Sequence, residues 1–407
     1  MNNNLTYTIE INLQDYPEMN SYNNIELIER RNKVIQLITD KSAEACIITS
    51  PVNIYYLCGF IFDGFLYLQQ GEEPILFVKR PNDIVGENVV TIRKPEQIPE
   101  YLTQHNMPIP KIIMAETDVM PYTMALRLRA AFGANELLNA SAEMRNIRCI
   151  KSEYEIGIMK SSAQIHASVY KQIPTIYRKG MTDIEFQIEM EYLMRKSGSM
   201  GIFRTFGQNM DIFMGSILAG DNGQAASPFD FALGGSGVTP ILPIGANGTA
   251  LKSGTTLMVD MAGNYKPLMD DMTRSFAIDY APPLAVKAHQ VSIDILNAIS
   301  KSAKSGTPAA ELYFLAEQIS KDNELDSYFM GTKQQAKFVG HGVGLEINEP
   351  PVLAPRSKEI LKTGMSIAIE PKFVLPGIGP VGVENTYIVR EEGLENITIC
   401  DESLIIL

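Results

Sequence analysis

The sequence predicts two domains, an α/β domain over residues 1–149 and an α+β domain over residues 150–407. The length of 407 residues exceeds the roughly 150 residues of a usual single domain. Along the first part of the chain, short apolar runs alternate with amphipathic stretches, which is typical of strands alternating with helices. Near residue 150 the pattern changes to long amphipathic helices and strand-like runs, which indicates helices packed on an antiparallel sheet.

In the first domain the spacing of apolar residues predicts helices and short strands in turn. Helices are expected over residues 24–39 and 121–132. Strands are expected over residues 44–49, around Tyr67, and over residues 74–78 and 111–115. Together these elements predict a mixed sheet covered by helices.

The second domain carries clearer helix signals. Two capping boxes, over residues 152–155 and 182–185, each open a helix with a buried apolar stripe. A third helix is expected over residues 285–302, and a fourth opens at Thr307 with Pro308 in its first turn. Strand-like runs lie at residues 257–261, 273–278, 366–370 and 383–389. These elements predict helices layered on an antiparallel sheet.

Composition disfavours several classes of protein. The 35 basic and 47 acidic residues give a net charge of −12, which repels polyphosphates and argues against nucleic-acid binding. No run of eighteen apolar residues occurs, and residues 1–20 lack the charged and apolar regions of a signal peptide. The four cysteines have neither CxxC spacing nor the density of a disulfide scaffold. We therefore expect a cytoplasmic protein without nucleic-acid or membrane partners.

A first candidate site consists of two aspartates on a predicted hairpin. Asp260 and Asp271 lie 11 residues apart in strand-forming segments that flank a turn, so they can face each other across one ladder. Two carboxylates that close repel each other unless a cation holds them. Asp270 must point to the opposite side of its strand and is left out of the site. Without further residues, a pair of solvated turn aspartates is the more common explanation of this pattern.

Three residues downstream strengthen the case for a metal. His341 lies between glycines, which let its ring approach a crowded centre, whereas Glu370 and Glu384 lie near the ends of apolar runs. A carboxylate buried there needs a partner. An oxygen-rich set with one imidazole suits Mn, Co, Zn or Fe, and bridging carboxylates suit two such ions roughly 3.5–4 Å apart.

These residues, in this order and context, resemble the metal ligands of the pita-bread metallopeptidase family, which includes methionine aminopeptidase, prolidase, aminopeptidase P and creatinase. The segments 53–59 and 145–152 are similar to the N-terminal domain of prolidase, aminopeptidase P and creatinase, a domain that methionine aminopeptidases lack. The resemblance implies a creatinase-like α/β N-terminal domain followed by an α+β pita-bread catalytic domain.

The resemblance also implies roles for the five residues. Asp271 and Glu384 would bridge two divalent ions, Asp260 would complete one ion, and His341 with Glu370 would complete the other. Glu370 would be the general base that takes a proton from a metal-bridging water as it attacks a scissile carbonyl. The function implied is a divalent-metal-dependent hydrolase that cleaves a small peptide or amide next to proline through a metal-bridging hydroxide. The family also implies a homodimer.

Several positions depart from the family pattern. Where a second histidine is usual, seven residues after His341, this chain has Asn348, our candidate substrate-binding residue. No histidine lies between His166 and Asp260, and the counterpart region is a Gly/Pro-rich loop over residues 234–245. The arginine often found two residues before the last ligand is Gly382. These departures keep two alternatives open, namely a metal-dependent hydrolase or lyase of a non-peptide small molecule, and a non-catalytic peptidase-like binding protein.

The remaining notable side chains have local interpretations. His166 and His289 fall inside expected helices and are predicted to be helix-face residues. Arg274 is expected either to orient Asp271 or to form an ion pair in the core. The loop over residues 234–245 is expected to be a lid or substrate loop, because no Gly-Lys-Ser/Thr of a phosphate cradle follows its glycines.

Overall fold

The computed structural model describes residues 25–86, 88–207 and 212–407. The segment 1–20, interpreted above as lacking a signal peptide, lies outside the described residues. The chain divides into two compact units, residues 1–147 and 148–407, which are described separately. The domain ranges predicted from the sequence stay a prediction. No helix in the described ranges is long and apolar enough to cross a membrane.

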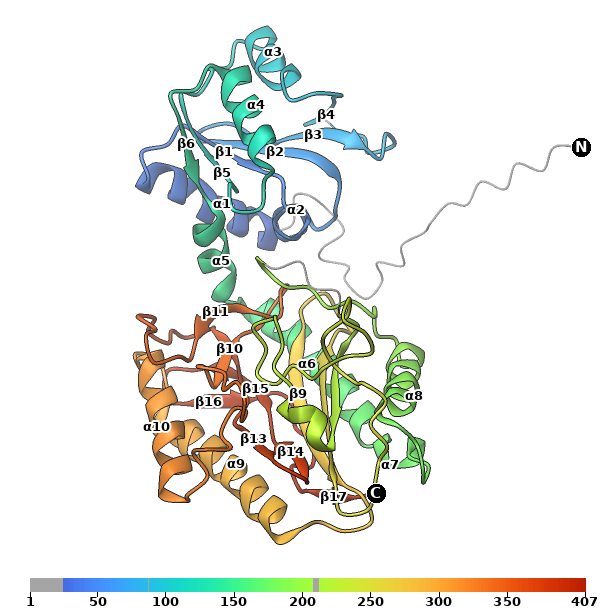
Figure 1. The fold of residues 1–407 in the computed structure, drawn as a ribbon. Coiled ribbons are helices and arrows are strands. Elements are labelled where there is room, and N and C mark those ends of the chain that lie inside the picture. Colours follow the sequence, from blue (N-terminus) through green and yellow to red (C-terminus); the bar gives the residue numbers. More distant parts are fainter. Residues whose placement is uncertain (1–24, 87, 208–211) are drawn as a thin grey trace, which may run out of the picture. The chain divides into compact units, whose positions relative to one another are not determined.

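The first unit contains a six-stranded mixed sheet in the order β4-β3-β2-β1-β5-β6 (Figure 1). Its strands are β1 (Ala45–Ile48), β2 (Asp63–Gln69), β3 (Ile75–Arg80), β4 (Val89–Thr91), β5 (Ile112–Ala115) and β6 (Glu136–Asn139). The pairs β1/β2 and β2/β3 are antiparallel, whereas β1/β5, β5/β6 and β3/β4 are parallel. This arrangement confirms the predicted mixed sheet.

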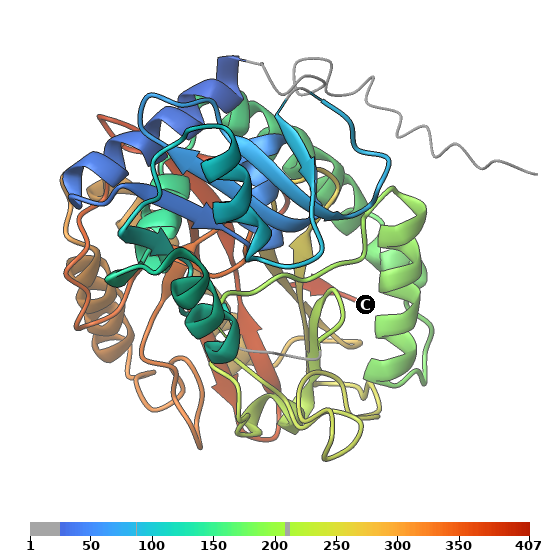
Figure 2. The ribbon, with the colours of Figure 1, turned by 90° about the horizontal axis from the view of Figure 1, so that it is seen from above.

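Helices cover both faces of this sheet. They are α1 (Ile25–Asp40), α2 (Pro51–Cys58), α3 (Gln97–Gln104) and α4 (Tyr122–Phe132), and a further helix, α5 (Ser141–Cys149), follows β6. Figure 1 shows α1 and α2 on one side and α3 and α4 on the other, and Figure 2 looks down on α3 and α4. Ile98 of α3 and Leu128 of α4 share a buried cluster with Ile47 and Tyr67 of the sheet.

The segment 53–59, which resembles the N-terminal domain of the family, has a structural role in this unit through Asn53. The buried carboxylate of Glu116 accepts hydrogen bonds from the backbone N–H groups of Thr49 (2.6 Å) and Ser50 (2.8 Å) and from Asn53 Nδ2 (2.5 Å). Because these groups surround the start of α2, Glu116 fixes the chain where β1 turns into that helix.

The second unit contains three sheets. A four-stranded sheet has the order β17-β9-β8-β7, a five-stranded sheet has the order β11-β10-β12-β15-β16, and β13 pairs with β14. The strands are β7 (Gly215–Ala219), β8 (Thr256–Gly263), β9 (Asp270–Ala277), β10 (Gly340–Gly342), β11 (Glu349–Val352), β12 (Ser366–Ile369), β13 (Lys372–Leu375), β14 (Gly379–Gly382), β15 (Asn385–Val389), β16 (Leu394–Asn396) and β17 (Ile405–Ile406). Apart from the parallel β17/β9 pair, these pairings are antiparallel, as predicted.

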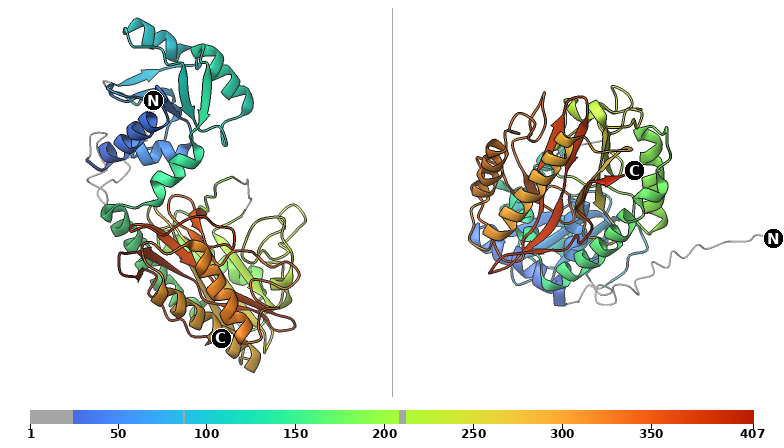
Figure 3. Two further views of the ribbon diagram at one scale, coloured as in Figure 1. Left: turned by 90° about the vertical axis from the view of Figure 1, so that its left-hand side faces the viewer. Right: turned by 90° about the horizontal axis from the view of Figure 1, so that it is seen from below.

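Two groups of helices pack on these strands. They are α6 (Glu153–Tyr170), α7 (Ile173–Ile176), α8 (Asp183–Lys196), α9 (Pro283–Ser302) and α10 (Ala309–Asp322), with a 3₁₀ turn η3 (Gly220–Gln224) after β7. Phe186 and Met190 of α8 pack against the four-stranded sheet, whereas α9 and α10 share a core with β12 to β15. In the view from below in Figure 3, the orange helices α9 and α10 and the green helices α6 and α8 lie to either side of the strands.

The helix starts follow the predicted capping chemistry. Both capping boxes are formed, with Ser152 as the N-cap of α6 and Thr182 as the N-cap of α8. At α10 the structure differs slightly from the prediction, because Pro308 is the N-cap residue and the helix begins at Ala309. A proline is suited to this position because the N–H it lacks would have no partner within the helix.

Candidate metal centre

The first pair of predicted ligands lies on the hairpin of β8 and β9. The register pairs Asp260 with Thr273 and Asp271 with Ala262, so the two aspartates are offset by two positions rather than directly opposite. Residues two apart on a strand share a face, and the aspartates therefore point to the same side of the ladder. Asp270 points to the other side, where its Oδ2 lies 2.7 Å from Nδ1 of the buried His166.

The other three predicted ligands come from the five-stranded sheet. Glu370 follows β12 and Glu384 precedes β15, one step beyond the paired residues Ile369 and Asn385, so the ladder brings the two glutamates to the same end. His341 lies on the neighbouring strand β10. Its flanking glycines are required by close packing, because a Cβ on Gly340 would lie 2.3 Å from the carbonyl oxygen of Ala368.

All five predicted residues meet in two overlapping groups. Ligand atoms of Asp271, His341 and Glu384 lie within 4.8 Å of one another, and so do those of Asp260, Glu370 and Glu384. His341 Nε2 is 3.4 Å from Glu370 Oε1 and 3.9 Å from Asp271 Oδ2. Glu384 belongs to both groups, which is the geometry expected of a carboxylate that connects two cationic positions.

A sixth residue, Lys372, which we did not predict, occupies one of these groups. Its Nζ lies 2.8 Å from Asp260 Oδ2, 2.5 Å from Glu370 Oε2 and 3.3 Å from Glu384 Oε2. The side chain is fully buried, at 0% exposure. A signal was present in the sequence, since a residue two positions after Glu370 on an extended segment points to the same side.

The protein's own charges affect the two groups differently. Burial raises the pKa of Glu370, but the Lys372 ammonium and the His341 ring outweigh burial and lower this pKa to about 2. Burial raises the pKa of Glu384 to about 8 although Lys372 opposes it. Burial and the Glu384 charge also hold the pKa of Asp271 well above its usual range. Asp271 and Glu384 thus retain the greater need for an added cation.

The hydrogen-bond partners and donor atoms of the two groups indicate which group fits a divalent ion. Glu384 Oε1 is buried and has no hydrogen-bond partner among the described residues. The Glu384 carboxylate, Asp271 and His341 form a mixed oxygen and nitrogen donor set that suits a divalent transition metal. The group around Asp260 and Glu370 fits an ion poorly, because an ammonium already contacts its oxygens.

Two threonines position the acidic side chains and were not predicted either. Thr273 Oγ1 donates to Glu384 Oε2 at 2.6 Å, which leaves Oε1 as the free oxygen of that carboxylate. Thr386 Oγ1 accepts from the Asp271 N–H (2.8 Å) and donates to the Asp271 carbonyl oxygen (2.9 Å). These hydroxyls link β9 to β15 beside the centre.

Arg274 does neither of the two things expected of it. Its buried guanidinium donates to the carbonyl oxygens of Glu384 (2.8 Å) and Asp401 (2.7 Å) and to Asn385 Oδ1 (2.9 Å). Its hydrogen bonds are therefore to backbone carbonyls and an amide rather than to Asp271 or another carboxylate. Arg274 holds the C-terminal segment against β15, so its role is in packing.

The side-chain amide of Asn348 is hydrogen-bonded to the backbone of Phe206. Its Oδ1 accepts from the Phe206 N–H at 2.8 Å, and its Nδ2 donates to the Phe206 carbonyl oxygen at 3.1 Å. Ile347 also donates its N–H to the carbonyl oxygen of Arg204 at 2.8 Å. The amide thus ties the segment 204–206 to the loop before β11, and its contact with a substrate stays a prediction.

The segment 145–152, which also resembles that N-terminal domain, contains two basic residues, Arg148 and Lys151, that have buried acidic partners. Lys151 Nζ lies 2.8 Å from Glu349 Oε2, and Arg148 contacts Glu349 Oε1 at 3.2 Å and also pairs with Glu346. Arg148 and Lys151 are thus compensated by Glu346 and Glu349, the acidic residues on either side of Asn348.

The Gly/Pro-rich loop is anchored by Asn222 of η3. Asn222 Oδ1 accepts from the Ser236 N–H at 2.9 Å, and its Nδ2 donates to the Gly245 carbonyl oxygen at 3.0 Å. Gly237 has a φ of +68° and a Cβ there would lie 1.8 Å from the Leu242 carbonyl oxygen, so only glycine fits this turn. The role of the loop as a lid stays a prediction.

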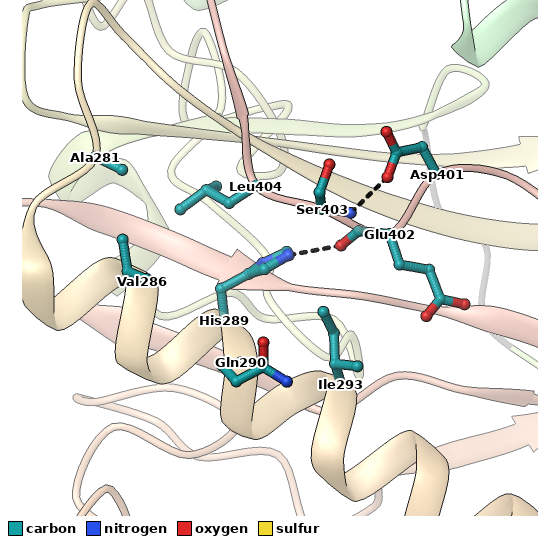
Figure 4. Close-up of a pocket in the computed structure, with 9 residues that line it drawn as sticks. All are labelled: Ala281, Val286, His289, Gln290, Ile293, Asp401, Glu402, Ser403 and Leu404. Carbon is teal, nitrogen blue, oxygen red and sulfur yellow. Dashed lines mark hydrogen bonds between the residues drawn. The ribbon is translucent and has the colours of Figure 1, made fainter.

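His289 lies at a separate pocket of about 390 Å³ (Figure 4). Its Nε2 is 2.7 Å from the Glu402 carbonyl oxygen, and Val286, Ile293 and Leu404 line the same hollow. None of the five predicted ligands contributes to this pocket. Burial lowers the pKa of His289, so the ring is neutral at pH 7 and serves as a packed hydrogen-bonding residue of α9.

Comparison with known proteins places the two units in described families. Residues 157–391 match the model of metallopeptidase family M24, and residues 30–150 match that of the creatinase/prolidase N-terminal domain. An Xaa-Pro dipeptidase of Pyrococcus furiosus is 24% identical over 384 residues, which cover 93% of this chain and 99% of that protein.

Solved structures are similar over the same extent. An Xaa-Pro dipeptidase from Bacillus anthracis has a TM-score of 0.78 and 23% identity, covering 94% of this chain and all of that one. An X-Pro aminopeptidase from Thermotoga maritima has a TM-score of 0.76 and 20% identity, covering 93% and 99% of the two chains. These matches confirm the predicted fold class, an α/β creatinase-type domain followed by an α+β pita-bread domain.

Proposed function

Because the chain belongs to metallopeptidase family M24, we propose that it is a divalent-metal-dependent hydrolase that cleaves a small peptide or amide next to proline. The observation that carries this proposal is the convergence of His341 with the carboxylates of Asp271 and Glu384, of which Glu384 has a buried oxygen without a hydrogen-bond partner among the described residues. The preference for proline is supported by the 93% coverage of this chain by the Pyrococcus furiosus Xaa-Pro dipeptidase.

Asp271, His341 and Glu384 are the residues that would hold a divalent ion, which we propose to be Mn, Co, Zn or Fe. Such an ion supplies Lewis acidity toward a scissile carbonyl and toward a water molecule. The ring of His341 is oriented for this task, because its Nδ1 contacts the Gly342 carbonyl oxygen at 3.1 Å and leaves Nε2 facing the acidic residues.

Glu370 is the candidate proton acceptor. Its carboxylate lies between His341 Nε2 at 3.4 Å and Lys372 Nζ at 2.5 Å, and these neighbours keep it ionised and therefore able to receive a proton. Lys372 also weakens it as a base, because the ammonium stabilises the charged form. A lower rate than that of a prolidase without this lysine is the expected consequence.

The second candidate function is the cleavage of a non-peptide small molecule, either by hydrolysis or by a lyase reaction. It is favoured by Asn348, whose amide is engaged with the Phe206 backbone at the position where the resemblance predicts a substrate-facing histidine. A peptidase-like binding protein without turnover is less well supported, because a binding surface has no need for this set of buried acidic groups.

The test is a hydrolysis panel with the full chain, loaded separately with each of the four metals. Xaa-Pro dipeptides, dipeptides without proline and small amides are compared, and Asp271→Asn serves as the variant without a complete site. Cleavage of Xaa-Pro dipeptides that is absent in Asp271→Asn supports the first function. Metal binding without cleavage of any dipeptide would refute it, and cleavage of amides alone would favour the second.

We further propose that the protein is a cytoplasmic homodimer, as the two-domain branch of the resemblance implies. Light scattering at micromolar concentration is expected to give twice the 45.1 kDa mass of one chain. A mass of one chain would end this proposal.

A further inference from the structure

We infer that the Lys372 ammonium takes the place of one of the two cations in this centre, so that the chain binds a single divalent ion. The inference refines the metal site of the proposed function and rests on the same set of ligands. Lys372 begins β13, two residues after Glu370, and projects into the group formed by Asp260, Glu370 and Glu384.

The carboxylates of this group engage all three donors of the ammonium. An ammonium carries three N–H donors, and Nζ has three carboxylate oxygens within reach, at 2.8 Å, 2.5 Å and 3.3 Å. A transition-metal ion would lie about 2.0–2.2 Å from the same oxygens. The two cations would therefore overlap, and an ion could enter only after the lysine had left.

Packing around β13 keeps the lysine in place. Its backbone N–H points to Met330 Sδ at 3.4 Å, and its carbonyl oxygen accepts from the Met330 N–H at 2.8 Å. The next residue, Phe373, and its ladder partner Val381 are fully buried. Withdrawal of Lys372 would leave three acidic groups behind in a low-dielectric interior, which is costly.

The partner position across the ladder leaves room for the lysine. Lys372 is paired with Gly382. A Cβ on Gly382 would lie 3.0 Å from both Cα and Cγ of Lys372 and 2.7 Å from the Pro371 carbonyl oxygen. Because Gly382 also stands where the resemblance predicts an arginine, a cationic side chain is present on one strand of this hairpin and missing from the other.

In the second group the described residues provide no ammonium, and the basic member is the imidazole of His341. Glu384 directs Oε2 to Lys372 and to Thr273, whereas its Oε1 has no partner among the described residues. The carboxylate of Glu384 groups with Asp271 and His341. Glu384 thus connects an ammonium on one side with a single ion site on the other.

Metal stoichiometry and spin coupling test the inference without reference to activity. The full chain is stripped with a chelator, loaded with Mn(II), desalted and analysed for metal content and by electron paramagnetic resonance. The wild type is expected to hold one ion with the spectrum of an isolated Mn(II). Lys372→Gly is expected to hold two ions with an exchange-coupled spectrum, whereas the control Lys358→Gly, on the surface, keeps one.

Each other outcome overturns the inference. Two ions in the wild type would show that the lysine moves aside, and none would show that the second group is no ion site. One ion in both the wild type and a folded Lys372→Gly would mean that the lysine does not limit the number of metal ions bound. If Lys372→Gly fails to fold, Lys372→Ala and the wild-type stoichiometry decide. Failure of the hydrolysis panel would refute the proposed function and leave a one-ion result intact.

Discussion

The two halves of the candidate centre are built from similar acidic groups, yet they are compensated in different ways. Asp260 and Glu370 contact the Lys372 ammonium at 2.8 Å and 2.5 Å. Asp271 is grouped with His341 and Glu384, and one oxygen of Glu384 has no hydrogen-bond partner among the described residues. One half therefore contains an ammonium, whereas the other contains the His341 imidazole, which must lose its proton to bind a metal ion. Stability of the first half should not depend on metal, whereas occupancy of the second half should.

The largest expected effect is that of Lys372→Met. Removing the ammonium leaves three buried carboxylates facing one another, and loss of one partner from a buried ion pair typically costs about 3–5 kcal/mol. Urea unfolding in the presence of a chelator is expected to show a loss of this size. Lys358→Met is the matched surface control, and a loss below about 1 kcal/mol for Lys372→Met would contradict the role of the lysine as an internal cation.

Glu349→Gln removes one partner from a buried ion pair outside the candidate metal centre. The variant leaves Lys151 without its carboxylate, although Arg148 keeps Glu346, so we expect a loss of about 3 kcal/mol that does not depend on metal. Unfolding with and without a chelator measures this loss, with the exposed Glu311→Gln as the control. A loss of stability that appears only after chelation would show that this ion pair depends on metal, and it would contradict the prediction.

Glu349 also predicts a pH dependence. Burial raises its pKa, but Lys151 and Arg148 outweigh burial and hold it below the ordinary glutamate value. Its contribution is therefore fully present above the unfolded pKa of about 4.3 and is lost as the pH falls through the folded pKa. The stability difference between the wild type and Glu349→Gln is expected to shrink from pH 5 toward pH 2. A difference that grows with acid would reverse the sign and contradict the pairing.

Asp271→Asn should weaken the half that needs an added ion. An amide oxygen is a neutral and weaker ligand than a carboxylate, so we expect an affinity loss of roughly 100-fold, or about 2.7 kcal/mol. Titration calorimetry with Mn(II) measures it. Asp270→Asn is the matched control, because the Asp270 carboxylate faces His166 on the other side of β9. Equal binding by the wild type and Asp271→Asn would remove the basis of the assignment.

The smallest expected effect is that of Asn348→His. A ring can keep only one of the two contacts with the Phe206 backbone, so we expect a stability loss of about 1 kcal/mol. If the position faces substrate, kcat/KM for Xaa-Pro dipeptides should rise at least roughly tenfold, below the 10²–10⁴ of a well-placed acid or base. Asn297→His on the exposed face of α9 is the control. Unchanged hydrolysis at full metal content would favour the non-peptide substrate.

Much of the local structure follows from short stretches of sequence. The capping boxes at Ser152 and Thr182 are formed as predicted, since each depends only on residues within one helical turn. The aspartate hairpin is formed as well, but with Asp260 and Asp271 offset by two positions. The register depends on how the turn between the strands is closed, and spacing alone cannot specify this.

By itself, the sequence determined the fold class, because strand alternation and glycine positions are local properties, and its resemblance to the pita-bread family identified the five residues that converge. The tertiary structure decided how those residues are compensated. Lys372 reaches Asp260 across 112 residues of chain, Glu349 reaches Lys151 across 198, and Arg274 reaches Asp401 across 127. The physical reason is that the energy of a buried charge depends on which groups surround it in space. Those groups are brought together only when the sheets and helices have packed.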